Sequence, residues 1–416
     1  MTMQEKIRPG YKQTEVGVVP EDWVCAPLNS LGEILTGGTP PTGIRDLWGS
    51  GYPWVTPSDI KGYRDIFETE RSITAAGIGR LRALPQNTVL VTCIASIGKN
   101  AILRRAGSCN QQINAVVPRS SCSPEFIYYL MEHSVDRLKA NAGITATAII
   151  SKKTFGSLLF AVPDFLEQSA IAEALSDADA RIAALEALIA KKHDLKQAAM
   201  QQLLTGKTRL PGFSGDWEVK RLGELGSTYG GLTGKSKVDF GHGSAKYIPF
   251  MNIMANVVVD PNSLERVDVR PGETQNQARA GDLFFNGSSE TPEEVGMCAL
   301  LAENVEDLYL NSFCFGFRLK SDAAANGLFL AGYFRSQQGR DLLASLAQGA
   351  TRYNLSKRAL LKVEFACPPL DEQVAIAEVL SDMDAELAAL DAEAKKARTI
   401  KQGMMQNLLT GKVRLV

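Results

Sequence analysis

Two stretches of the chain carry apolar residues at alternating steps of four and three. The first seam consists of Ile171, Leu175, Ala178, Ile182, Leu185 and Ile189, and the second of Ile376, Leu380, Met383, Leu387, Leu390, Ala394 and Ala397. This spacing aligns apolar side chains along one stripe of a helix and is typical of a coiled coil. We therefore predict two long helices, each about 40 residues and roughly 60 Å in length.

The two stretches are copies of one another. Residues 167–210 recur as residues 372–415 at a constant offset of 205, without a gap and with more than half of the positions identical. Pro163 and Pro368 precede the two copies, and Gly206 and Gly411 follow them as helix terminators. Two unrelated solvent-facing helices are the alternative, but two copies with matching stripes favour packing against each other in the antiparallel sense.

The segments that precede the two helices also resemble each other, but with fewer matching residues. Asp22-Trp23 matches Asp216-Trp217 at an offset of 194, and Ser151-Lys152 matches Ser356-Lys357 at an offset of 205. The second globular part therefore carries about eleven more residues than the first, and the sequences diverge between the matched ends. We place the domain boundaries at 1–163, 164–206, 207–367 and 368–416.

Both globular parts are predicted to mix helices and strands. Short apolar runs that are bounded by Gly, Pro and Asn indicate strands, at residues 88–94, 113–117, 282–285 and 313–319. Longer periodic segments indicate helices, at residues 124–140 and 326–346. The fold class is therefore α+β, with two pseudo-symmetric mixed α/β domains and a long antiparallel pair of helices; the strand order does not follow from the sequence.

Composition narrows the class of protein. No apolar run approaches the roughly 18 residues of a membrane span, and the first residues lack the apolar stretch of a signal peptide, so we expect a cytoplasmic protein. The seven cysteines are scattered and never spaced as Cys-x-x-Cys, which predicts small buried thiols in place of disulfides or zinc. The formal net charge of -1 does not by itself suggest a nucleic-acid partner.

No motif for catalysis, metal or nucleotide is complete. TGKT at 205–208 and TGKS at 233–236 lack the earlier glycine of a phosphate loop, and the first is repeated as TGKV at a helix end. His133, His193 and His242 are isolated, and neither a Gly-x-Ser-x-Gly elbow nor a His-Glu-x-x-His pair occurs. We therefore predict no catalytic residue, no metal and no cofactor in this chain.

Several short motifs occur in a characteristic order around the duplicated helix. They are GGTP at 37–40, YPWVTPSDI at 52–60, SIGKNAIL at 96–103, NQQI at 110–113, GDLFFNGSSETPEEVG at 281–296, GATRYNLSK at 349–357, and the helix starts EQ-x-x-IAE-x-LSD at 167 and 372. In this order they resemble the DNA-sequence-specificity subunits of Type I restriction-modification systems, from about Gly10 to Leu415.

The resemblance implies a function. In that family two target-recognition domains each read one half of a split DNA site, and the conserved helices set the spacer between the halves. The resemblance further implies a non-catalytic chain that docks two methyltransferase subunits and is joined by restriction subunits. S-adenosylmethionine, ATP and Mg are then expected in those partners. The alternative is a coiled-coil scaffold or decoy of the same architecture that no longer reads DNA; a stand-alone enzyme is a third, more remote reading.

Polar loop residues are the candidates for contact with double-stranded DNA, because hydrogen-bonding side chains read base edges. In the first domain we select Thr39, Thr42, Ser58, Lys61, Ser96, Lys99, Thr145 and Thr147; in the second, Thr233, Lys235, Asn252, Asn286, Ser288, Ser289, Thr351, Arg352 and Tyr353. For each of them the structural alternative is a turn or cap role.

Overall fold

The computed structural model describes residues 7–143 and 147–415, and these divide into two compact units. Unit 1 is Met1–Glu186 together with Ala392–Val416, and unit 2 is Ala187–Asp391. Each unit therefore holds one globular domain, the first part of the helix that follows it and the last part of the other long helix. Across the described residues no helix is both long enough and apolar enough to cross a membrane.

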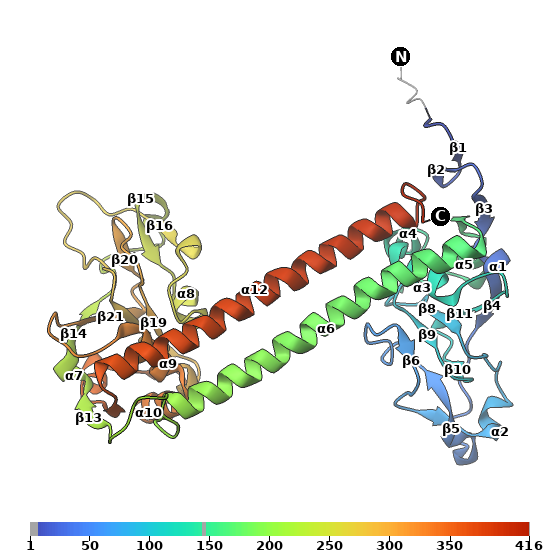
Figure 1. Ribbon diagram of the computed structural model, residues 1–416. Coiled ribbons are helices and arrows are strands. Elements are labelled where there is room, and N and C mark those ends of the chain that lie inside the picture. The colour runs from blue at the N-terminus through green and yellow to red at the C-terminus, as the bar shows by residue number, and fades with distance from the viewer. Residues whose placement is uncertain (1–6, 144–146, 416) are drawn as a thin grey trace. The chain divides into compact units, whose positions relative to one another are not determined.

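Unit 1 combines short strands with short helices (Figure 1). Its strands are β1 (Tyr11–Thr14), β2 (Gly17–Pro20), β3 (Val24–Pro27), β4 (Gly32–Thr36), β5 (Trp48–Val55), β6 (Asp65–Ile66), β7 (Ser72–Ile73), β8 (Thr88–Thr92), β9 (Asn100–Leu103), β10 (Ser108–Cys109), β11 (Ile113–Pro118) and β12 (Leu159–Val162). Its helices are α1 (Leu28–Leu31), α2 (Ala75–Ile78), α3 (Pro124–His133), α4 (Val135–Ala140), α5 (Lys152–Ser157) and the first part of α6 (Phe165–Leu203).

Unit 2 repeats this plan. Its strands are β13 (Glu218–Arg221), β14 (Gly226–Gly230), β15 (Phe240–Ile248), β16 (Glu265–Val267), β17 (Leu283–Asn286), β18 (Ser288–Ser289), β19 (Cys298–Leu300), β20 (Leu308–Leu310), β21 (Cys314–Leu319), β22 (Tyr353–Asn354) and β23 (Glu364–Cys367). Its helices are α7 (Leu222–Leu225), α8 (Phe250–Ala255), α9 (Gly327–Arg335), α10 (Gln337–Ser345), α11 (Lys357–Leu360) and the first part of α12 (Leu370–Leu408).

The repeat extends through the middle of the domains, where the sequences diverge. In unit 1 the sheet order β4-β11-β8-β9 has its counterpart in β14-β21-β17-β19 of unit 2. A second sheet places β10 parallel and β7 antiparallel to β5, just as β20 and β16 flank β15. The predicted mixed α/β class and the pseudo-symmetry of the two domains are thus confirmed.

The two predicted medium-length helices are each broken once. Residues 124–140 form α3 and α4, which are separated at Ser134, and residues 326–346 form α9 and α10, which are separated at Ser336. Ser336 is extended, and its hydroxyl accepts the amide of Gly339 as a new helix cap. The prediction of a single helix was wrong at both serines; at Ser336 the hydroxyl offers the backbone this local partner in place of the helical one, whereas Ser134 makes no such cap.

The long helices run antiparallel to each other within each unit (Figure 1). In unit 1, Asp179 pairs with Lys401 at 2.8 Å and Arg181 with Glu393 at 2.8 Å. In unit 2, Lys192 pairs with Glu386 at 2.6 Å and Lys196 with Asp384. Each helix is 39 residues long, so the predicted pair of long antiparallel helices is confirmed.

The seam residues are buried or half-buried throughout, namely Ile171, Leu175, Ile182, Leu185, Ile189, Ile376, Leu380, Met383, Leu387 and Leu390. The first two seam residues of each helix also pack into the core of the domain that precedes the helix. Ile171 and Leu175 join Phe126 of α3 in the core of unit 1, and Ile376 and Leu380 join the core of unit 2. The start of each helix is thus part of its own domain.

A buried carboxylate ties each unit together. In unit 1 the Glu167 carboxylate accepts a hydrogen bond from the Trp23 indole at 2.9 Å and pairs with the Arg414 guanidinium at 2.6 and 2.8 Å. In unit 2 the Glu372 carboxylate accepts the Trp217 indole at 3.1 Å and pairs with Arg209. We call each set of three residues a carboxylate joint. Each joint connects the first helical turn, the domain start and the segment that follows the other long helix.

The glycine that ends each long helix serves the same joint. Gly206 and Gly411 both have a φ of +69°. A Cβ at Gly411 would lie 2.4 Å from the Cδ of Pro20 and 3.4 Å from the Trp23 ring, and one at Gly206 would lie 3.3 Å from the Trp217 ring. Only glycine combines this backbone conformation with so close an approach.

Replacing Gly411 with alanine should lower the free energy of unfolding by about 1–3 kcal/mol, because alanine is strained at positive φ and its methyl group meets Pro20. Gly403 provides the matched control. It lies inside α12 with nothing within 4 Å of an added Cβ, so Gly403→Ala should stabilise the protein by about 0.5–1 kcal/mol. Chemical denaturation of both variants measures the difference; equal effects would contradict the role assigned to Gly411.

Candidate nucleic-acid interface

Three loops of unit 1 meet where β4 and β11 approach each other. The loop after β4 packs tightly on the segment before β11, since a Cβ at Gly37 would lie 2.2 Å from the Asn110 carbonyl oxygen. The Gly38 amide donates to the Cys109 carbonyl at 2.8 Å. These contacts bring the exposed Thr39 hydroxyl to 2.6 Å from the Gln111 side-chain oxygen. The GGTP and NQQI motifs therefore form one structure.

The YPWVTPSDI motif joins the same edge. The Asn110 amide donates to the Val55 carbonyl at 2.9 Å, and the Trp54 indole donates to the Gly38 carbonyl at 2.8 Å. The turn that follows β5 carries the exposed Ser58 and Lys61. Beside it, the Arg71 guanidinium lies 3.8 Å from the centroid of the Trp48 ring, which leaves a cation and an aromatic face next to the polar turn.

A third loop, between β8 and β9, carries Ser96 and Lys99. The Cys93 amide donates to the Gln112 carbonyl at 2.8 Å, which fixes this loop against the NQQI segment. Lys99 is exposed and Ser96 is half-buried. Of the remaining predicted residues in this domain, Thr42 and Thr147 are exposed, while Thr145 lies outside the described residues.

Unit 2 contains the same arrangement of loops held together by backbone contacts, which we call the loop frame, but with different side chains. A Cβ at Gly231 would lie 2.0 Å from the Asn311 carbonyl oxygen, and the Leu232 amide donates to the Leu310 carbonyl at 2.7 Å. Thr233 occupies the position of Thr39 and is exposed; its backbone amide donates to the Gln275 side-chain oxygen at 3.0 Å, and the Gln275 side-chain amide donates to the Thr233 carbonyl at 2.8 Å. The second domain thus holds its polar loop by the same backbone contacts as the first.

The asparagine before the central strand sets both frames. The Asn110 side-chain oxygen accepts the Gln112 amide at 3.1 Å, and that of Asn311 accepts the Phe313 amide at 2.9 Å. This is the asparagine turn in which a side chain replaces a backbone carbonyl. In unit 1 the following Gln111 is exposed and Gln112 is half-buried, and in unit 2 Phe313 is 59% exposed.

The second domain adds a cation at this edge. Arg352 is exposed, and its guanidinium lies 5.7 Å from the centroid of the Phe313 ring. Thr351 is also exposed, whereas Tyr353 is half-buried and pairs with Ser289 across β22 and β18. Gln111, Gln275 and Phe313 were not among the predicted residues. An asparagine followed by polar or aromatic residues before a buried strand signals the turn that carries Gln111 and Phe313, but Gln275 lies outside such a turn.

Lys235 is held inside the second domain. Its side chain is 5% exposed, and its ammonium donates to the Glu273 carboxylate at 2.7 Å and to the Asp268 carbonyl at 2.6 Å. The hydrogen bond from Lys235 lowers the pKa of Glu273 to about 2. The lysine of the TGKS motif therefore anchors its own loop instead of facing solvent.

Four more predicted residues of this domain are buried. The Asn286 side-chain amide donates to the Glu294 carbonyl at 2.9 Å, and the Asn252 side-chain amide donates to the Asp260 carbonyl at 2.9 Å. Ser288 and Ser289 are each 8% exposed. The predicted residues of the second domain that remain accessible are therefore the exposed Thr233, Thr351 and Arg352, and the exposed Phe313 and the half-buried Gln275 lie beside them.

The other chemically active side chains are dispersed. Among residues 7–143 and 147–415, no three His, Cys, Asp or Glu residues are placed to hold a metal ion. Burial and the nearby Lys412 lower the pKa of His133, while His193 and His242 are exposed. All seven cysteines are free thiols, and burial raises the pKa of Cys93 and Cys367 to about 11.

Comparison with known proteins identifies the family. The family model of the Type I restriction modification DNA specificity domain matches twice, at residues 20–192 and 214–398. The MjaIX specificity subunit of Methanocaldococcus jannaschii is 29% identical over 236 residues, which are 52% of this chain and only 54% of that protein. The putative MjaX specificity subunit of the same organism is 25% identical over 434 aligned positions, which cover 97% of each chain.

A solved structure shows the same fold. The S subunit of a Type I restriction-modification system from M. genitalium aligns with a TM-score of 0.55 and 14% identity, covering 98% of this chain and 99% of that one. Both copies of the family model fall on the two units that carry the duplicated loop frame. The chain therefore belongs to the Type I restriction modification DNA specificity family.

Proposed function

We propose that the chain is the non-catalytic subunit that gives a Type I restriction-modification complex its DNA sequence specificity, with each unit reading one half of a two-part site. The observation that carries this proposal is the duplicated loop frame. Backbone contacts at Gly37 and Gly231 are the same in the two units, while the side chains that the frames present differ. A conserved frame with variable polar residues is suited to reading two different sequences.

The exposed side chains have the chemistry for base edges. The exposed Thr39 and Gln111 in unit 1, and the exposed Thr233 with the half-buried Gln275 in unit 2, offer hydroxyl and amide groups that both donate and accept hydrogen bonds. Arg352 adds a guanidinium, which suits guanine or a phosphate oxygen. The DNA surface proposed here thus excludes the buried Asn252 and Asn286.

The low net charge bears on affinity. Binding to DNA gains much of its strength when basic side chains displace counterions from phosphates, and a chain of net charge -1 has little excess for this. We propose that two methyltransferase subunits dock on the exposed faces of α6 and α12 and supply phosphate contacts. S-adenosylmethionine, ATP and Mg belong to these subunits and to the restriction subunits, and the long helices set the spacer between the half-sites.

Coexpression of this chain with a methyltransferase subunit of a Type I restriction-modification system from the same source organism tests the proposal. We expect adenine methylation in one split motif of the host genome, read by methylation-aware sequencing, and none when the methyltransferase is expressed alone. A complex that forms but methylates no split motif would favour the alternative, a scaffold or decoy of the same architecture.

Exchange of one domain tests whether each unit reads its own half of the DNA site. Replacing residues 212–366 with the equivalent segment of a relative should change one half of the methylated motif and leave the other half unchanged, because each loop frame is built within its own unit. The reciprocal exchange of residues 18–161 is the control and should change the opposite half. A change in both halves after either exchange would show that the units do not read independently.

A further inference from the structure

The first helix beside the sheet is anchored alike in both units. The Ser123 amide before α3 donates to the Gln168 side-chain oxygen at 3.1 Å, and the Asn326 amide before α9 donates to that of Gln373 at 2.8 Å. Gln168 and Gln373 are the same position of the long-helix repeat. The two short helices therefore correspond residue by residue, and Phe126 and Phe329, three residues after the caps, are both fully buried.

One position of this alignment differs sharply between the units. In unit 1 it holds Tyr129, which is fully buried against the long helices. The Tyr129 hydroxyl donates to the Asp179 carboxylate at 2.8 Å and lies 3.3 Å from the Ser176 hydroxyl oxygen. The Lys401 ammonium lies 5.4 Å from the ring centroid and 2.8 Å from Asp179. A serine, an aspartate and a lysine thus surround one phenol ring.

In unit 2 the corresponding residue is Gly332, and no ring fills the space. The three polar partners are nevertheless repeated at the offset of 205, as Ser381, Asp384 and Lys196, with Lys196 again paired to the aspartate. A Cβ at Gly332 would meet Leu204 at 3.8 Å and Leu380 at 3.9 Å, both ordinary contacts. The environment of a buried tyrosine is therefore present without the tyrosine.

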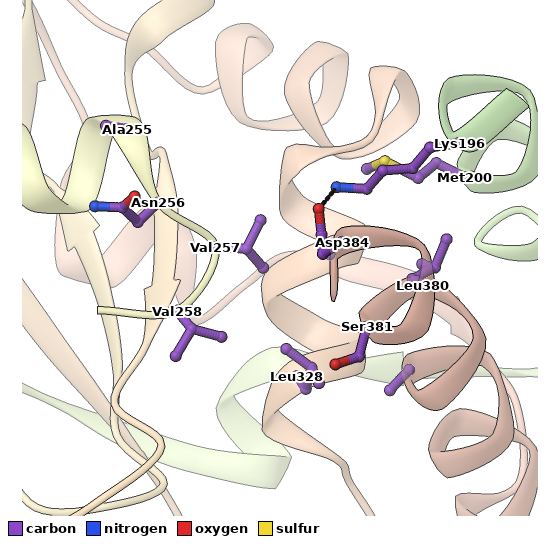
Figure 2. A pocket seen from close by; sticks show the side chains of 12 residues that line it. Lys196, Met200, Ala255, Asn256, Val257, Val258, Leu328, Leu380, Ser381 and Asp384 are labelled. Atoms are coloured by element: carbon purple, nitrogen blue, oxygen red, sulfur yellow. Dashed lines mark hydrogen bonds and ion pairs between the residues drawn. The ribbon is translucent and has the colours of Figure 1, made fainter. Parts of the chain in front are cut away.

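A cavity of about 380 Å³ occupies this place (Figure 2). Its apolar lining comes from α6, α9, α12 and the segment after α8, and consists of Met200, Val257, Leu328, Gly332, Ala377 and Leu380. Figure 2 shows the Lys196 and Asp384 pair and the Ser381 hydroxyl beside these apolar side chains. An apolar wall with a few convergent polar groups is the usual composition of a binding pocket, and the volume lies within the usual range.

The wall after α8 is fixed in position. The guanidinium of the half-buried Arg335 donates to the Asn256 carbonyl at 2.6 Å and to the Cys298 carbonyl at 2.5 Å. Ala255, Val258, Ser381 and Asp384 are exposed, so the cavity opens to solvent along this side. The site is therefore formed in advance and accessible to an incoming group.

We propose that this cavity of unit 2 binds the tyrosine side chain of a partner protein. The ring would lie over Gly332 as the Tyr129 ring lies in unit 1, with its hydroxyl donating to Asp384 beside Ser381 and with the Lys196 ammonium over the ring, as Lys401 lies over Tyr129. The chain itself supplies the precedent for this chemistry, and the open side admits a side chain that remains attached to a backbone. This site lies apart from the DNA-facing loops, and the inference does not depend on DNA recognition.

Methionine-methyl NMR of the full chain tests the site, with 4-methylphenol and N-acetyl-L-tyrosinamide as probes. Met200 lines the cavity, and Met405 is its repeat counterpart in unit 1, where it lines a hollow with Asp179 and Lys401, the residues that already hold Tyr129. Both probes should shift the Met200 signal and leave Met405 unchanged. No shift at Met200, or equal shifts at both methionines, would overturn the proposal. Binding of 4-methylphenol without N-acetyl-L-tyrosinamide would overturn the tyrosine assignment in favour of a small free phenol.

Two variants separate the parts of the proposal. Gly332→Tyr should fill the cavity and abolish the probe-induced shift at Met200 while the remaining methionine signals stay in place. Asp384→Asn on the exposed rim leaves the core intact and should weaken 4-methylphenol about tenfold, as expected for loss of a hydrogen bond to a charged acceptor, without changing the weaker binding of toluene. If Asp384→Asn affects both molecules equally, or neither, hydroxyl recognition by Asp384 is wrong.

Discussion

The carboxylate joint is the interaction on which each unit depends. Glu167 and Glu372 are almost completely buried, and a buried carboxylate is tolerated only when charged and hydrogen-bonding partners surround it. An indole and a two-pronged arginine supply those partners in both units. In unit 1 the side-chain hydrogen bonds to Glu167 and Asp22 raise the pKa of Arg414, and the same arginine lowers the pKa of Asp22. The joint thereby holds the last residues of the chain in the first domain.

From this joint follows the organisation of the whole chain. The first domain is completed by the segment that follows α12, and the second domain by the segment that follows α6. The compact units therefore do not coincide with the two copies of the sequence repeat. The backbone frames at Gly37 and Gly231 rest on these closed units and leave their loop side chains free to vary. The two units also differ inside the domain, at the equivalent positions Tyr129 and Gly332. Unit 1 has a buried tyrosine ring there, whereas unit 2 has a cavity lined by the same kinds of polar side chain.

The features that repeat in the sequence were predictable, and those that depend on three-dimensional neighbours were not. The helix pair followed from the seam spacing and the gapless offset, and the strands at residues 88–92 and 113–118 from their apolar runs. The strand order did not follow, because β5 and β10 pair in parallel across a long connection. Polar residues such as Asn286 were predicted to contact DNA because of their residue type. The side chain of Asn286, which ends an apolar strand, instead forms hydrogen bonds inside the domain, to the backbone of Glu294 and Met297.

Hydrogen exchange of two matched variants tests most directly whether one kind of joint closes each unit. Glu167→Gln and Glu372→Gln keep the side-chain shape and remove the charge that pairs with arginine. We predict that the first lowers amide protection at residues 19–24 and 408–415 within unit 1, and that the second does so at residues 203–219 within unit 2, each leaving the other unit protected. Unchanged protection around the substituted joint, or equal loss in both units, would contradict the account.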